Sequence, residues 1–256
     1  MNTIDLLSKR VSLRQYKDED IKKEDLDLIL NGAMRAPTAG NMMLYSIIVV
    51  KNQEKRKLLA KYCDNQPFIA KAPVSLIFVA DMYKLYNYLG YSNILSYCME
   101  QDKELVTPNN SKLFLAAGDA FIAAQNAVVA AESIGVGSCY IGDIVENHDQ
   151  VKELLNLPKW TIPVAMLTLG YYPEGSNISP RSRFDKEFIV FDEEYKILDG
   201  NDYQRMYAKT HFNEQNTVGA KNFGQLVYAR KLGSDFAMEM EDSLKKYLEE
   251  WFIKEY

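Results

Sequence analysis

Arginine side chains recur at a two-residue spacing in two short segments of this sequence. One is Arg10-Val11-Ser12-Leu13-Arg14 and the other is Arg181-Ser182-Arg183. A guanidinium group is a rigid planar donor whose shape matches phosphate oxygens. In an extended segment alternate side chains share one face, so Arg10, Ser12 and Arg14 would point the same way. The two segments together predict a phosphate site, although each alone also fits an exposed polar edge.

The chain as a whole is acidic, which makes these basic segments local features. It has 256 residues, a formal net charge of −5, 47% hydrophobic residues and 25% charged residues. This composition is typical of globular proteins. A nucleic-acid-binding protein would show a basic surplus, so no nucleic-acid partner is expected.

Motifs that would supply reactive groups from the protein itself are missing. The three cysteines (Cys63, Cys98 and Cys139) have no C-x-x-C spacing, and two histidines cannot form a metal triad, so no metal is expected. Gly135-Val136-Gly137 suggests a dinucleotide fingerprint, but Tyr140 occupies the third glycine position and a helix precedes the motif. Demanding chemistry would therefore come from a bound cofactor, and the arginines favour an anionic one.

The least polar long segment of the chain is predicted to be its central helix. Residues 113–134 are apolar on nearly every side, so the helix must be covered all round. Asp119 and other polar residues interrupt the apolar run, which favours a domain centre or subunit interface over a membrane. Gly135 is expected to end the helix. A strand over 136–142 follows, and its small residues indicate that something flat or bulky lies close to it.

The remaining pattern predicts a single domain with a C-terminal appendage. An apolar strand over 46–51 is expected at the centre of the sheet, because it reads as buried on both faces. The N-terminal residues lack the layout of a signal peptide, so a cytoplasmic location is expected. Further strands are expected over 74–80 and 162–170, and helices over 2–9, 24–36, 54–63, 149–155 and 236–256. The last helix is amphipathic, and Ser243 is expected on its solvated face. The apolar face of such a helix commonly docks on a partner subunit.

Five blocks occur in the order that is typical of the flavin-dependent nitroreductase family. They are Arg10-x-Ser12-x-Arg14 with Tyr16, the segment Ala36–Asn41, Gln66, the segment Ala131–Gly142, and Arg181-Ser182-Arg183. Over residues 4–199 the sequence resembles this family. It is most similar to the larger members with a C-terminal extension, such as the NADPH-preferring nitroreductases and the flavin reductases.

The resemblance implies an α+β fold of three layers, with a central, mostly antiparallel sheet flanked by helices, in an entwined homodimer with two FMN sites. Residues 1–199 would form the FMN-binding domain. Residues 200–256 would form a helical extension that packs on this domain or on the partner subunit.

The resemblance also implies which residues hold FMN. Those of one chain would be Arg10, Val11, Ser12, Arg14, Gln66, Tyr140, Ile141, Gly142, Asp143, Arg181 and Arg183, and Thr38, Gly40 and Asn41 would come from the other. The arginines would hold the phosphate and the polar edge of the flavin. The flavin itself would be the reactive group, supported by the charge of Arg14 and the backbone of Gly142. The sequence departs from many relatives at Val11, Met43 and Arg181, where arginine, glutamine and lysine are common.

The implied activity is hydride transfer from NADPH or NADH through FMN to a nitroaromatic, a quinone or free flavin. Two alternatives keep the same cofactor: a reductase or dehydrogenase of another specialised substrate, and a flavin-binding protein without turnover. Preference for NADPH would require extra cations, for which Lys209, Lys221, Arg230 and Lys231 are candidates.

Overall fold

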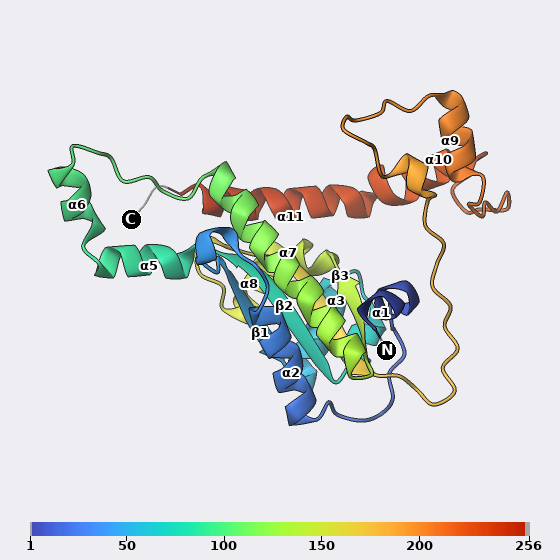
Figure 1. The fold of residues 1–256 in the computed structure, drawn as a ribbon, viewed down its shortest axis with the longest axis horizontal. Coiled ribbons are helices and arrows are strands. Elements are labelled where there is room, and N and C mark those ends of the chain that lie inside the picture. Colours follow the sequence, from blue (N-terminus) through green and yellow to red (C-terminus); the bar gives the residue numbers. More distant parts are fainter. Residues whose placement is uncertain (1, 254–256) are drawn as a thin grey trace. The chain divides into compact units, whose positions relative to one another are not determined.

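A computed structural model describes residues 2–253 of the chain (Figure 1). The chain divides into two compact units, one made of Met1–Ser179 with Met240–Tyr256 and the other of Pro180–Glu239. The expected boundary after residue 199 lies inside the second unit. The last helix belongs to the first unit from Met240 onward, because Tyr247 and Trp251 are buried there with Tyr86 and Trp160.

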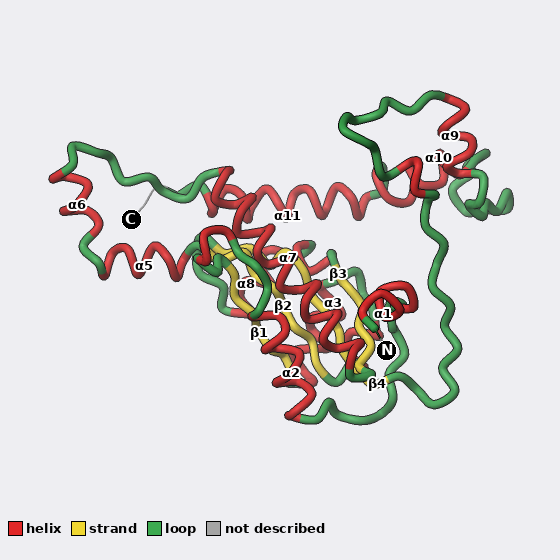
Figure 2. Tube along the Cα trace, viewed as in Figure 1, coloured by secondary structure: helices red, strands yellow, loops and turns green. Residues whose placement is uncertain are grey.

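The first unit is built on one antiparallel sheet (Figure 2). Its strands are β1 (Tyr45–Val50), β2 (Val74–Asp81), β4 (Thr161–Tyr171) and β3 (Val136–Ile141), in that spatial order. Each strand pairs antiparallel with its neighbour. Every residue of β2 is buried, as expected for an interior strand. The antiparallel α+β prediction is confirmed.

The prediction that residues 46–51 form a central strand was wrong, because β1 lies at one edge of the sheet. Ile47 packs against the hydrophobic cluster on one face of the sheet and Ile48 against the cluster on the other. The uninterrupted apolar run therefore reflects coverage of both faces, which an edge strand can also have.

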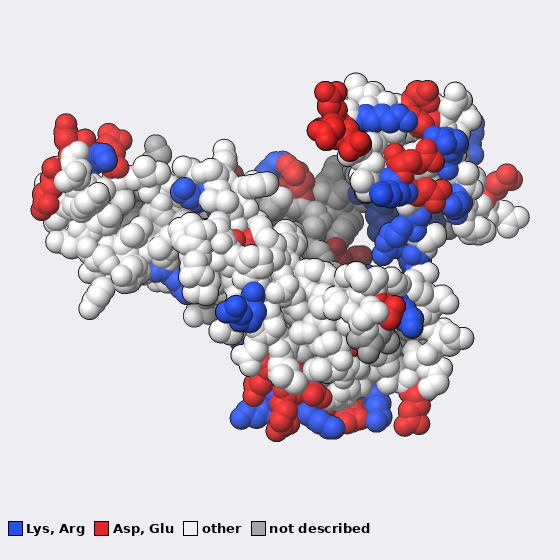
Figure 3. Space-filling view, viewed as in Figure 1, with Lys and Arg blue, Asp and Glu red and all other residues white. Residues whose placement is uncertain are grey.

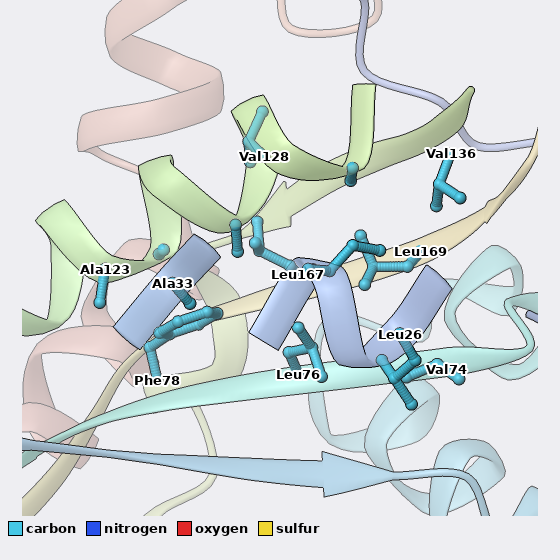
Figure 4. Close-up of a cluster of buried hydrophobic side chains, with 14 of the residues drawn as sticks. Leu26, Ala33, Val74, Leu76, Phe78, Ala123, Val128, Val136, Leu167 and Leu169 are labelled. Carbon is cyan, nitrogen blue, oxygen red and sulfur yellow. The ribbon is translucent and has the colours of Figure 1, made fainter. Parts of the chain in front are cut away.

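Helices α2 (Lys23–Met34) and α7 (Asn110–Ser133) cover one face of the sheet (Figures 1 and 4). Buried alanines of α7, including Ala123 and Ala127, pack with Leu26, Phe78 and Leu167 in one hydrophobic cluster. A Cβ on Gly32 of α2 would lie 2.7 Å from the Ala130 Cβ atom, so the two helices cross closely. Gly135, with φ of 81°, ends α7 in the left-handed conformation that was predicted.

Helices α3 (Gln53–Tyr62), α4 (Pro67–Lys71) and α8 (His148–Leu155) form the layer on the opposite face. Leu59, Ile69 and Val151 from these helices are buried against Ile77 and Met166 of the sheet. Helices therefore enclose the sheet from both sides, and the three-layer prediction is confirmed.

The remaining helices are divided between the two units. They are α1 (Thr3–Lys9), α5 (Tyr83–Tyr91), α6 (Ile94–Glu100), α9 (Gly200–Tyr207), α10 (Phe223–Val227) and α11 (Asp235–Trp251). The Asn2 side chain caps α1 by accepting a hydrogen bond from the Asp5 amide at 2.9 Å. Residues 254–256 of the predicted last helix, and Met1, lie outside the described residues.

Among the described residues, α7 is the one helix that is long and apolar enough to cross a membrane. The core helix of a soluble protein has the same composition, and the alanine-rich side of α7 is buried against α2 and the sheet. The expectation that the protein has no membrane partner stays a prediction.

Candidate functional site

The first arginine segment runs in extended conformation beside β3. Ser12 forms a parallel bridge with Ser138, and the Leu13 amide donates to the Ser138 carbonyl oxygen at 2.8 Å. Val11 and Leu13 are buried, whereas Ser12 is half-buried and Arg14 is exposed. The predicted alternation of side chains is confirmed. The Val11 side chain belongs to the core, which leaves only its backbone for a ligand.

Glycines of the β3 region have two different surroundings. A Cβ on Gly137 would lie 2.5 Å from a methyl carbon of Leu13 and 2.9 Å from the Tyr172 ring. The bulky groups that lie close to the strand at this position are thus side chains of the protein itself. A Cβ built on Gly142, directly after β3, would meet no atom within 4 Å. The backbone there is therefore open to a flat ligand.

Arg10 lies in the electrostatic surroundings of a partly buried carboxylate. The Tyr172 hydroxyl donates to both oxygens of Glu132, at 2.9 and 3.1 Å. Burial raises the pKa of Glu132, and the Tyr172 hydrogen bond and the charge of Arg10 act against this rise. Burial also raises the pKa of Tyr140 to about 12, again against the charge of Arg10.

Arg14 lies near both an aromatic ring and a buried thiol. Its guanidinium carbon is 5.7 Å from the centre of the Phe68 ring in α4, within the range of a cation–π contact. Burial raises the pKa of Cys139, and the charge of Arg14 and a hydrogen bond with Ser12 act against this rise. Ser12 and Arg14 therefore approach β3 at Cys139, two residues before Ile141.

Gln66 joins this region from the start of α4. Its side-chain amide nitrogen donates to the Asp143 carboxylate at 2.5 Å and to the Cys63 carbonyl oxygen at 3.1 Å. The amide is thereby held next to Gly142. Contacts through Phe68, Asp143 and Ser138 thus bring the Arg10–Arg14 segment, Gln66 and the end of β3 into one region.

This region suits an anionic, planar cofactor. Two guanidinium groups and a hydroxyl supply donors for a phosphate, and an oriented amide can recognise a polar ring edge. The space above Gly142 admits a ring that a side chain there would obstruct. The residues present therefore fit FMN.

Thr38, Gly40 and Asn41 lie in a different part of the first unit. They belong to a loop with one short 3-10 turn (Ala39–Asn41), and this loop is bonded to Asp119 near the middle of α7. Asp119 precedes Glu132 by 13 residues, which corresponds to about 20 Å along the helix axis at 1.5 Å per residue. Within the described part of one chain, the loop and the Arg10–Arg14 segment are therefore separated.

Arg181 and Arg183 belong to the second unit, where they are exposed. Arg183 donates from Nη1 to the Arg181 and Ser182 carbonyl oxygens at 3.2 and 3.4 Å. Their convergence with Arg10 on a single phosphate stays a prediction.

Sequence reasoning missed three polar residues that the structure places in important contacts. The interruption of an apolar helix was the available signal for Asp119 and Glu132. Ser243 was expected on a solvated helix face, but it is buried, bonds the His148 amide at 2.9 Å and also donates to the Val145 carbonyl oxygen. Across residues 2–253 no group of three His, Cys, Asp or Glu side chains could hold a metal ion.

Comparison with known proteins agrees with this geometry. The nitroreductase family model matches residues 7–171. An FMN reductase (NADPH) of Bacillus subtilis (strain 168) is 32% identical over 197 residues, which cover 77% of this chain and 75% of the relative. An NAD(P)H FMN reductase of the same organism is 33% identical over 184 residues, with coverage of 72% and 70%.

The fold is also similar to that of solved structures. The NADPH:FMN oxidoreductase from Vibrio harveyi, complexed with NAD+, aligns with a TM-score of 0.78 and 25% identity, over 96% of this chain and 98% of that one. With the family model covering most of the first unit, the chain belongs to the nitroreductase family.

Proposed function

We propose that this chain is an FMN-dependent oxidoreductase that takes hydride from NADPH or NADH and passes electrons to a small acceptor such as a nitroaromatic, a quinone or free flavin. The observation that carries the proposal is the convergence of Arg14, the Gln66–Asp143 pair and the open backbone of Gly142 at the end of β3. The similar proteins that are named FMN reductases support both FMN and a nicotinamide donor.

FMN, when bound, supplies two-electron transfer between the nicotinamide and the acceptor. Arg10 and Ser12 would hold its phosphate. Arg14 would place a positive charge where negative charge develops, and its guanidinium also contacts the Phe68 ring. A preoriented charge of this kind requires little reorganisation during the reaction.

Gln66 and Gly142 would recognise the ring. The Gln66 amide nitrogen is already engaged by Asp143 and the Cys63 carbonyl oxygen, so its orientation is fixed and Oε1 is left to accept from a ring N–H. The Gly142 backbone offers an N–H at an unobstructed position. These contacts orient the ring without a side chain that transfers protons.

A homodimer is part of the proposal. Phe114, Phe121 and Ile122 of α7 are 80%, 48% and 43% exposed, and the face of the first unit over α7 is largely uncharged (Figure 3). The free edge of β1 also borders an apolar groove of about 650 Å³. A second copy would cover these surfaces, and its Thr38 and Asn41 could complete a site that one chain leaves incomplete.

The nicotinamide donor is left as NADPH or NADH. In the second unit, acidic and basic side chains are interspersed (Figure 3). Lys209 is paired with Asp185 at 2.8 Å, so it is less available for the 2′-phosphate of NADPH. Lys221, Arg230 and Lys231 remain candidates for that contact. We also propose that the enzyme is cytoplasmic and has no nucleic-acid partner; the net charge of −5 supports the second of these points.

Anaerobic reduction of the purified, FMN-loaded protein tests the activity. NADPH or NADH should bleach the flavin absorbance rapidly, and the ratio of the two rates gives the donor preference. Arg14→Gln should slow reduction by roughly tenfold to a hundredfold, whereas Arg14→Lys, which keeps a cation, should lose less. A yellow protein that neither donor bleaches would instead be the non-catalytic flavin-binding protein. Bleaching without turnover of nitroaromatics, quinones or flavins would favour a specialised substrate.

A further inference from the structure

Asp119 is a buried carboxylate in the middle of the apolar helix α7. Its side chain is only 3% exposed. One oxygen accepts a hydrogen bond from the Ala39 amide at 2.9 Å, and the other accepts from the Leu44 amide at 3.1 Å. Two charge-assisted bonds from backbone donors can keep a carboxylate in such a position. The carboxylate therefore joins the two ends of the intervening loop.

The loop between these two amides is conformationally demanding. Gly40, Asn41 and Met43 have φ of 56°, 56° and 50°, all in the left-handed region. Residues other than glycine adopt this region at a cost in free energy, so contacts with the surrounding structure must hold the loop in this conformation. Inside the loop, the Thr38 hydroxyl accepts a long hydrogen bond of 3.4 Å from the Met43 amide. The Asp119 carboxylate is the better-placed restraint, because it is buried and bonds both ends.

The anchored ends and the free tip of the loop differ in exposure. Leu44 is buried beneath the loop, whereas Gly40 and Asn41 are exposed. The strained tip presents Asn41 to solvent together with Met42 and Met43, which are 44% and 51% exposed. The arrangement suits a loop whose tip contacts a ligand and must be held in one conformation before that ligand arrives.

We propose that Asp119 is a positioning residue for the flavin: it preorganises residues 38–44 so that the polar groups of Thr38 and Asn41 can bind the ring edge of FMN in the site of a second copy. The inference rests on the proposed function. It assigns to α7 a role in cofactor affinity in addition to its role in the core.

The test compares Asp119→Asn with Asp81→Asn in the full-length protein. Asp81 is a suitable control because it is 5% exposed and its carboxylate bonds the Ser46 hydroxyl and the Lys84 amide. Its backbone amide donates to the Leu44 carbonyl oxygen at 2.9 Å, a bond that the substitution leaves in place, whereas among the described residues its side chain bonds none of the loop. FMN affinity is measured by quenching of flavin fluorescence, and stability by thermal unfolding. Asp119→Asn should weaken FMN binding roughly tenfold, since one anchoring bond is lost. Asp81→Asn should lower the unfolding temperature but leave FMN affinity within about twofold.

Hydrogen exchange of the wild-type apoprotein supplies a second readout that needs no variant. Slow exchange of the Ala39 and Leu44 amides without FMN supports preorganisation by Asp119. Protection that arises only after FMN is added overturns the inference, because the flavin would then order the loop.

Unchanged FMN affinity in Asp119→Asn, or equal weakening in both variants, also overturns the inference while leaving the flavin assignment intact. A wild-type protein that binds no FMN overturns the proposed function and this inference together.

Discussion

At the level of single side chains, Glu132 illustrates how the fold constrains the charges around Arg10. The carboxylate is partly buried beside Tyr172, and burial raises its pKa. A carboxyl group with a raised pKa keeps its proton in the folded protein over a pH range in which the unfolded chain has lost it. The contribution of Glu132 to stability therefore falls as pH rises from the ordinary glutamate range through the raised pKa.

Glu132→Gln should remove this pH dependence from the apoprotein. As pH rises through that window, the unfolding temperature of the variant should increase relative to that of the wild type by on the order of 2 °C. Tyr172→Phe should have the opposite effect, because the Tyr172 hydrogen bond lowers the pKa of Glu132. Thermal unfolding curves between about pH 4 and pH 8 measure both variants. Parallel curves for all three proteins would show that Glu132 does not titrate differently on folding.

At the level of secondary-structure elements, the position of the Arg10–Arg14 segment depends on its packing against β3. Leu13 and Tyr172 fill the space that a side chain at position 137 would need. Gly137→Ala should therefore destabilise the protein by about 1–3 kcal/mol, the usual range for an overpacked site. It should also weaken FMN binding, because the segment that carries Arg10 and Arg14 must shift.

Gly142→Ala is the matched comparison in this part of the chain. The new methyl group meets no atom within 4 Å. The free energy of unfolding, measured by chemical denaturation, should therefore change by less than about 0.5 kcal/mol. FMN affinity should nevertheless fall if the ring lies against this backbone. Equal stabilities of the two alanine variants would contradict the packing argument.

Periodicity predicted the elements well where a local pattern sets the structure. The alternation of Val11 and Leu13 and the stop at Gly135 are local features, and both are confirmed. The edge position of β1 could not be predicted, because strand order depends on contacts distant in sequence. Ser243 was misplaced for a similar reason, since its partners at Val145 and His148 are almost a hundred residues away.

The candidate site was predicted residue by residue only through family resemblance. Composition and spacing suggested an anion site at Arg10 and Arg14, but they did not identify Gln66 or Gly142. The contact of Arg14 with Phe68 and the anchoring of the 38–44 loop by Asp119 depend on tertiary packing. No local sequence pattern encodes such contacts.

For the molecule as a whole, the exposed side of α7 predicts association. Sedimentation of the purified protein should give twice the mass of the 29.3 kDa chain. Phe121→Lys, on that exposed side, should shift the protein toward the monomer and reduce its FMN content. Leu58→Lys, a comparable change on α3, should leave the mass unchanged. A wild-type monomer that retains FMN would contradict the shared site.

The separation of the 38–44 loop from the Arg10–Arg14 segment along α7 has a genetic consequence under the proposed dimer. Each flavin would then depend on the loop of one copy and the arginines of the other. An allele defective in the loop and an allele defective in the arginines could complement each other, since a mixed dimer would confine both lesions to one site and leave the other whole. Placing both lesions in a single allele, mixed with the wild type, would instead damage each site once.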